Sequence, residues 1–237
     1  MKNLKALTEE SVQSVCESIG HTWTFDLCNA CGMALVADQL RGLCTACGRV
    51  RSALRRGGPR ALMKHIQEGI PPEYAAAELD DFSREFNDRW FTAFSSNLAL
   101  VLAGPPGVGK TRCAWAVIRR LRAHGFRAEL MRAAEYLAAL RPDAPQTPKE
   151  QANALLTATF ACLDDLGAEG KASEWVNAQL QEFLDKRAAG KGCWTLITSN
   201  LGPIHFNERY SPAVASRLSG WVLLEVAGAD RRVREAV

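Results

Sequence analysis

One glycine-rich segment has the residue types and the spacing that bind phosphate groups. It begins at Gly104 and ends in the pair Lys110-Thr111, which fits the phosphate-loop pattern. The glycines let backbone N–H groups approach phosphate oxygens, and the Lys110 ammonium would contact the β- and γ-phosphates of a nucleotide. The Thr111 hydroxyl would be a ligand of Mg²⁺. We therefore expect a nucleotide-binding loop made of Gly104, Pro105, Pro106, Gly107, Val108, Gly109, Lys110 and Thr111.

Two adjacent carboxylates follow the apolar run at residues 159–163. A phosphate loop is paired with a strand whose terminal carboxylate holds Mg²⁺, and Asp164 is expected to fill this role. Asp165 would be the base that polarises the attacking water, with Glu169 as a second candidate. The combination of a phosphate loop with a strand that is followed by two acids predicts nucleotide hydrolysis. The Asp165 side chain is one methylene shorter than that of Glu, so we expect hydrolysis that is slow or depends on a partner.

Four cysteines are spaced as metal ligands. Cys28 and Cys31 form one C-x-x-C-G turn, and Cys44 and Cys47 form a second turn after 12 intervening residues. Two such turns supply the four thiolates that Zn²⁺ prefers in a closed, structural site. An iron–sulfur centre is the less favoured alternative for the same ligands. The spacing predicts a small zinc-ribbon domain ahead of the phosphate loop.

Short apolar runs alternate with helical patterns after residue 97, which is typical of βαβ units. The sequence therefore predicts an α/β domain with a parallel sheet that carries the phosphate loop and the two acids at strand ends. A helix with one apolar face is expected at residues 172–188, and a mobile loop at residues 141–151, which are polar and contain prolines. The five candidate strands are residues 98–103, 127–131, 159–163, 194–198 and 221–226.

Cationic side chains are unevenly distributed, although the formal net charge is only +3. Seven lie between Arg41 and Lys64 with no acid among them, and the basic run at residues 49–64 directly follows the second cysteine pair. This run is expected either to contact nucleic-acid phosphates, or to be a solvated linker face or a surface for an acidic protein partner, and the sequence favours neither. We place a domain boundary after it, which gives a zinc-binding domain with a basic linker at residues 1–67 and a second domain at residues 68–237.

The composition is that of a globular protein, with 47% apolar and 23% charged residues in a chain of 237. It excludes a disordered chain, which would be less apolar and more highly charged. No segment approaches the ~18 to 20 consecutive apolar residues of a membrane span, and the first ten residues contain no hydrophobic signal core. We expect a cytoplasmic protein without membrane contact.

Several further motifs accompany the phosphate loop, at residues 69–74, 79–82, 164–169, 195–201, 216–218 and 228–232. Together they make residues 68–233 resemble the AAA+ ATPases of the DnaC/IstB group, the bacterial and phage helicase loaders and transposition helper ATPases. The resemblance implies an AAA+ P-loop NTPase core with a five-stranded parallel sheet that binds ATP and Mg²⁺. Since the sequence ends at Val237, it also implies little or no C-terminal lid.

The resemblance also implies roles for individual side chains. Asn200 is similar to the sensor that hydrogen-bonds the attacking water or the γ-phosphate. Arg217 resembles the arginine finger that reaches from one subunit into the nucleotide site of the next, and Arg209 competes for this role. Arg232 falls where the family has a second sensor that contacts the nucleotide from within the same subunit, with Arg231 as the alternative.

Two aromatic residues, Tyr74 and Phe82, lie in the segment that family members fold against the adenine. Aromatic residues ahead of a core strand also serve as ordinary packing residues. The sequence leaves these two interpretations open.

The resemblance and the cysteine block together predict a function in DNA replication. We expect an ATP-dependent helicase loader whose zinc module docks on a hexameric replicative helicase. Its ATP-bound copies would contact one another through Arg217 and assemble on single-stranded DNA. Its ATPase activity is expected to be weak and to be stimulated by assembly, DNA or the partner. The alternative is a transposition helper ATPase that assembles on duplex DNA and activates a transposase. A further alternative is a DNA-binding adaptor that keeps ATP as a structural ligand, which the short Asp165 leaves open.

Overall fold

The computed structural model describes residues 63–96, 99–123, 125–168, 172–190, 193–228 and 230. Several predicted residues lie outside the described residues, namely Cys28, Cys31, Cys44, Cys47, Glu169, Arg231, Arg232 and most of the basic run. The zinc ribbon and the domain boundary at residue 68 therefore stay predictions. The chain divides into two compact units, one of Met1–Ala75 with Arg119–Arg127 and the other of Ala76–Ile118 with Ala128–Val237.

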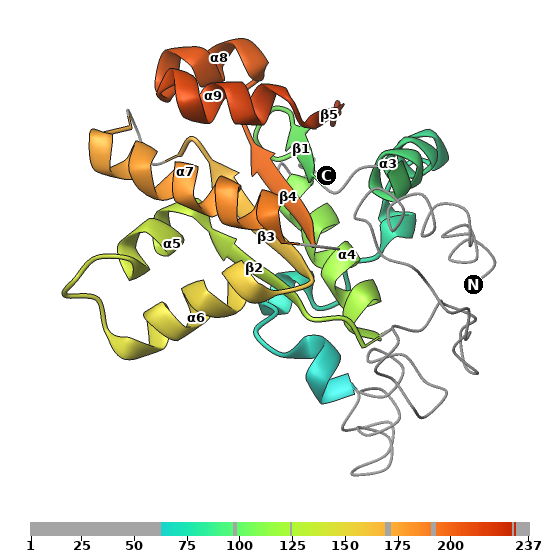
Figure 1. Ribbon diagram of the computed structural model, residues 1–237. Helices are drawn as coiled ribbons and strands as arrows, with labels where there is room; N and C mark the ends of the chain where they lie inside the picture. The colour runs from blue at the N-terminus through green and yellow to red at the C-terminus, as the bar shows by residue number, and fades with distance from the viewer. Residues whose placement is uncertain are drawn as a thin grey trace, which may run out of the picture. The chain divides into compact units, whose positions relative to one another are not determined.

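The larger unit contains a five-stranded parallel sheet, as the sequence predicts (Figure 1). Its strand order is β2-β3-β4-β1-β5, so the strand that leads into the phosphate loop, β1, pairs with β4 on one side and β5 on the other. Strands of a buried parallel sheet are nearly continuous apolar runs, which explains why the pattern located all five. They are β1 (Ala99–Ala103), β2 (Ala128–Arg132), β3 (Phe160–Leu166), β4 (Trp194–Ser199) and β5 (Val222–Glu225).

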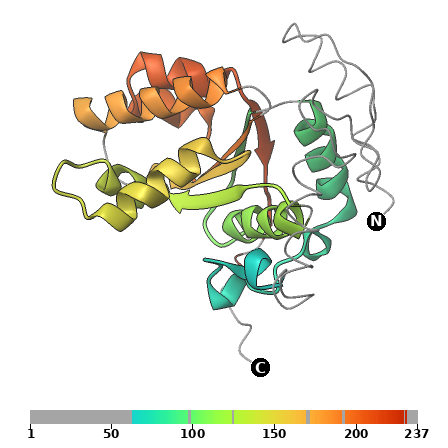
Figure 2. The same cartoon turned by 60° about the horizontal axis from the view of Figure 1, so that its bottom comes forward.

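Helices cover both faces of the sheet (Figures 1 and 2). Five of them, α5 to α9, lie on one face, and the start of α4 lies on the other. Their bounds are α3 (Arg84–Ser96), α4 (Lys110–Ala123), α5 (Ala133–Ala139), α6 (Gln146–Thr157), α7 (Glu174–Ala189), α8 (Pro203–Arg209) and α9 (Pro212–Ser219). Within the described ranges, none of the helices is long and apolar enough to cross a membrane.

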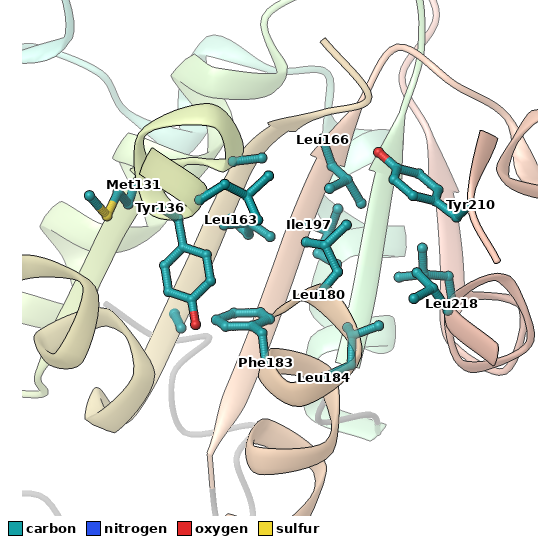
Figure 3. Close-up of a cluster of buried hydrophobic side chains, with 14 of the residues drawn as sticks. Met131, Tyr136, Leu163, Leu166, Leu180, Phe183, Leu184, Ile197, Tyr210 and Leu218 are labelled. Atoms are coloured by element: carbon teal, nitrogen blue, oxygen red, sulfur yellow. The ribbon is translucent and has the colours of Figure 1, made fainter. Parts of the chain in front are cut away.

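The main hydrophobic core lies between the sheet and the five helices (Figure 3). Leu163 and Ile197 project from neighbouring strands onto Leu180 and Phe183 of α7, and all four are almost fully buried. The Tyr136 ring of α5 meets the Phe183 ring edge-on, with the ring centroids 5.2 Å apart. Burial of such side chains stabilises the fold by about 1.5–3 kcal/mol each. This core fixes α7 and α9 against the strands that end in the predicted site residues.

Cysteine side chains fill part of the opposite face of the sheet. Cys162 on β3 and Cys113 on α4 are both inaccessible to solvent. Burial raises the pKa of the Cys162 thiol well above its usual range, and the nearby Asp164 and Cys113 add to the effect. These two cysteines are small buried side chains and are not among the four that are spaced as metal ligands.

The segment at residues 141–151 differs from the predicted mobile loop. A loop does follow α5, but α6 begins at Gln146 and continues to Thr157. The prolines suggested a break, yet Pro148 lies in the first helical turn, where the missing N–H has no intrahelical partner to lose. Ala152 and Leu155 then bury the inner face of the helix.

A buried arginine fastens the end of α7 to its neighbours. Arg187 is 3% exposed, and its Nε donates to Thr195 Oγ1 at 3.0 Å. Its Nη1 donates to the carbonyls of Leu156 and Ala158 at 2.9 and 2.6 Å, and its Nη2 donates to that of Trp194 at 2.6 Å. Burial lowers the pKa of Arg187. The guanidinium thereby joins the end of α6, the end of α7 and the start of β4.

In the described part of the smaller unit, residues 63–67 form a helical turn and Pro72–Tyr74 form a short 3-10 helix. Gln67 Nε2 donates to the Ala75 carbonyl at 3.1 Å, and the buried Arg122 side chain donates to the Glu68 carbonyl. These contacts hold the segment that carries Tyr74.

Candidate nucleotide-binding site

The phosphate loop lies between the end of β1 and the start of α4, which is the strand–loop–helix context that its sequence predicts. Gly104 N donates to the Ser199 carbonyl at 3.2 Å, which ties the loop to the end of β4. A Cβ atom on Gly104 would overlap the carbonyl oxygen of Val226. Gly107 has a φ of 79° in the left-handed region, and a Cβ there would overlap the Asp230 carboxylate. Both positions therefore require glycine.

Lys110 connects the loop to the predicted sensor. Its side chain is buried, and its Nζ donates to the carbonyls of Gly104 and Pro105, each at 2.8 Å. Nζ also donates to Asn200 Oδ1 at 2.7 Å. An ammonium has three N–H donors, so a phosphate oxygen that binds Nζ would exchange with one of these acceptors. The structure thus brings together two residues that are 90 positions apart in the chain.

Thr111 and Asp164 form the predicted magnesium pair. Thr111 Oγ1 lies 3.1 Å from each carboxylate oxygen of Asp164, and Thr198 Oγ1 donates to Asp164 Oδ1 at 2.6 Å. Burial raises the pKa of Asp164, whereas the hydrogen bonds from Thr198 and Thr111 oppose the rise. A hydroxyl and a carboxylate are hard oxygen ligands, and Mg²⁺ completes its shell with phosphate oxygens and water. The donor set therefore fits Mg²⁺.

Asp165 adopts an unusual backbone conformation. Its φ is 57°, and the pairing of β3 with β4 shifts register between Leu163 and Leu166. The Asp165 N–H donates to Thr198 Oγ1 at 2.8 Å, and Asn200 Nδ2 donates to Asp165 Oδ1 at 3.1 Å. Asp tolerates the left-handed region better than most residues. The kink lets both adjacent acids face the site, although neighbouring residues of a regular strand point to opposite faces.

Thr198 is the site residue that sequence reasoning left without a role. It is 1% exposed, and its single hydroxyl contacts the Asp164 carboxylate and the Asp165 N–H. The signal was a pair of polar residues, Thr198 and Ser199, that directly follow the apolar Leu196 and Ile197 at the end of β4. Ser199 Oγ likewise donates to the Leu166 carbonyl at 2.6 Å.

The two candidate arginine fingers have different surroundings. Arg209 on α8 donates to the Gly167 carbonyl in the loop that follows β3. Arg217 on α9 lies about a third exposed and forms an ion pair with Asp185 of α7, with Nε 2.5 Å from Oδ1. Arg209 is therefore bound next to the site of its own chain, whereas Arg217 lies at the surface.

The two aromatic candidates lie in separate units of the chain. Phe82 is buried and packs against Phe86 with ring centroids 5.2 Å apart, which is a packing contact. Tyr74 is half-buried. Just before Phe82, Asp81 forms an ion pair with Arg112 at 2.7 Å, which joins this segment to the first turn of α4.

Comparison with known proteins agrees with this geometry. A family model described as IstB-like ATP binding protein matches residues 83–216, more than half of the chain. No curated protein sequence matches the chain.

Three solved structures share the fold. DnaI is 22% identical, with a TM-score of 0.55 over 69% of this chain and 95% of its own. The DnaC helicase loader is 21% identical, with a TM-score of 0.55 over 66% of this chain and 100% of its own. A DNA replication initiation factor is 18% identical, with a TM-score of 0.54 over 67% of this chain, but the chain spans only about half (51%) of that protein's length.

Proposed function

The chain belongs to the family of IstB-like ATP-binding proteins, and from this membership we propose that it is an ATP-dependent loader of a hexameric replicative helicase. The family and the fold make it an AAA+ ATPase of a group that acts in DNA replication or transposition. The choice of helicase loading is supported by the DnaC helicase loader, whose solved chain this fold matches over its whole length. Function is carried by sites more than by folds, so the site must support the activity as well.

One arrangement carries the ATPase part of the proposal: Asn200 accepts from Lys110 and donates to Asp165. In the proposed reaction a water oxygen attacks the γ-phosphorus of ATP, and the bond to the β–γ bridging oxygen breaks. Asp165 accepts a proton from that water, while Asn200 orients it and Lys110 contacts the phosphates. Mg²⁺, held by Thr111 and Asp164, would neutralise developing charge on the phosphate oxygens. The products are ADP and phosphate.

The partners follow from parts of the chain outside this centre. We propose that Arg217 enters the nucleotide site of a neighbouring copy, so that hydrolysis accompanies assembly on single-stranded DNA. Zn²⁺ bound by Cys28, Cys31, Cys44 and Cys47 would fold residues 1–67 into the module that docks on the helicase. Arg232 would contact ATP within its own chain.

The test is native mass spectrometry of the full-length protein with ATP and the replicative helicase of the same organism. The expected result is a defined complex with the helicase hexamer that disappears when Cys44 and Cys47 are both changed to Ser. If the protein ignores the helicase under these conditions, helicase loading is wrong. ATP turnover is measured in parallel against Lys110→Ala, and equal rates even with DNA and helicase present would favour the adaptor that keeps ATP bound.

The family match itself supports a second candidate, a transposition helper ATPase. This protein would assemble on duplex DNA with ATP and activate a transposase. Assembly on duplex DNA in the absence of any helicase complex would favour this candidate.

A further inference from the structure

The Arg217 guanidinium is held on two sides by its own chain. Nε donates to Asp185 Oδ1 at 2.5 Å, and Nη2 donates to Asp185 Oδ2 at 3.0 Å. The carboxylate therefore makes a bidentate contact with one edge of the guanidinium. Nη1 donates to the Ala213 carbonyl one turn earlier on α9, at 2.9 Å. A guanidinium has five N–H donors, so two remain beyond these contacts. The side chain is therefore fixed in direction without all of its donors being used.

The two helices that carry this pair are themselves aligned. Asn177 Oδ1 on α7 accepts from the backbone N–H of Ser211, the N-cap of α9, at 2.7 Å. Val214 and Leu218 bury the inner face of α9. The backbones of α7 and α9 are thus fixed by contacts separate from the ion pair, so removal of the Asp185 charge should release the Arg217 side chain alone.

We infer that Asp185 is the positioning residue of the arginine finger and presents the open edge of the Arg217 guanidinium to the γ-phosphate of ATP in a neighbouring copy. This inference rests on the proposed function, because it requires Arg217 to act between copies. A flexible arginine would have to lose side-chain freedom in the transition state, whereas an arginine that is already aligned has lost it beforehand.

The exposure of the pair argues against the opposite role, in which Asp185 would hold Arg217 back. The Arg217 and Asp185 side chains are 35% and 51% exposed. Water and salt screen ion pairs at such positions, and they are weak. A weak surface pair can orient a side chain but cannot compete with the several negative charges of a nucleotide phosphate. With two N–H donors remaining, Arg217 can also bind phosphate while Asp185 stays in place.

The test measures ATP turnover by the full chain, dilute and without DNA, and concentrated with single-stranded DNA. Arg217→Ala is expected to lower the assembled kcat by about a hundredfold or more, and Asp185→Asn by about tenfold. The KM for ATP should be unchanged in Asp185→Asn, because Asp185 contacts the Arg217 guanidinium and not the nucleotide. Asp185→Glu, which keeps the charge, should recover part of the rate, and the double variant should be no slower than Arg217→Ala alone.

Lys186→Gln is the matched control, because Lys186 forms a second half-exposed ion pair on α7, with Glu182 at 2.5 Å. Its kcat and melting temperature should equal those of the wild type, and Asp185→Asn should melt at the same temperature as this control.

If Arg217→Ala slows assembled turnover but Asp185→Asn does not, the inference is wrong and the proposed function stands. Faster turnover in Asp185→Asn would show that Asp185 restrains the finger and would also overturn the inference. If Arg217→Ala has no effect, both fail.

Discussion

Asp165 combines a proposed chemical role with a backbone conformation that few side chains tolerate. Its left-handed φ of 57° accompanies the register shift in β3, and its carboxylate contacts Asn200. Substitutions at this position can therefore separate the two properties.

Asp165→Asn should keep the fold and lose hydrolysis. Asn tolerates the left-handed region and can still accept from Asn200, so the free energy of unfolding should change by less than about 0.5 kcal/mol. Asp165→Val should cost about 1–2 kcal/mol, because a β-branched side chain is strained at this φ. Urea denaturation and ATP turnover measure the two effects. Wild-type turnover by Asp165→Asn would mean that another group, with Glu169 as the next candidate, accepts the proton.

Asp164 gives a pH-dependent prediction. Burial raises its folded pKa above the ordinary value of 3.8, so the folded state holds more protons than the unfolded state between these two values. Stability therefore falls as pH rises through this window, and above the folded pKa the buried charge opposes folding. In EDTA at neutral pH, Asp164→Asn should melt at a higher temperature than the wild type, because the amide carries no buried charge. The gain should shrink as pH is lowered towards 3.8. A lower melting temperature for Asp164→Asn at neutral pH would contradict the prediction.

The phosphate loop and the acid pair could be predicted from the sequence because their residue types and spacing are themselves the requirement for phosphate and Mg²⁺ binding. The role of Thr198 and the kink at Asp165 could not be predicted. Both depend on how β3 pairs with β4, and a register shift in one strand is set by tertiary contacts that periodicity does not contain.

The strands and helices were largely predictable, since each buried element has the apolar period of its type. The strand predicted to end at Leu163 continues to Leu166 in the structure, through both acids. In a sequence, acidic residues usually indicate the end of a buried strand. Here Thr198 and Asn200, at the end of the neighbouring strand, donate hydrogen bonds to the two carboxylates. The early start of α6 was missed for a similar reason, because prolines signal a break yet are compatible with a first helical turn.

Arg187 gives the prediction for the packing of these elements. Its guanidinium donates to one hydroxyl and three carbonyls at the junction of α6, α7 and β4. Arg187→Met should lower the free energy of unfolding by about 2–4 kcal/mol, because buried carbonyls lose their donors. Arg187→Lys should recover little, since an ammonium cannot reproduce the planar fork. Urea denaturation should show a change below about 0.5 kcal/mol for the exposed neighbour in Lys186→Met, and an equal loss for the two Met variants would contradict this role.

For the whole chain, the cysteine block predicts one Zn²⁺ per molecule, bound by Cys28, Cys31, Cys44 and Cys47. Metal analysis of the full-length protein should find one equivalent of zinc, and X-ray absorption should give Zn–S distances of about 2.3 Å. Cys44→Ser should lose most of the metal while ATP binding is retained, because the phosphate loop belongs to the other unit. Iron and visible absorption in place of zinc would support the iron–sulfur alternative.

The buried Cys113 and Cys162 can be used to measure how often the nucleotide-binding core opens locally. Cys113 lies on α4, which begins at the phosphate loop, and Cys162 lies on β3, which contains the proposed Mg²⁺ ligand Asp164. Neither cysteine is accessible to solvent. A thiol reagent can reach them only when that helix and strand separate, so their alkylation rate reports the opening equilibrium. Bound ATP would contact both elements at once. It should therefore slow the alkylation of the two cysteines in proportion to the fraction of molecules that have ATP bound.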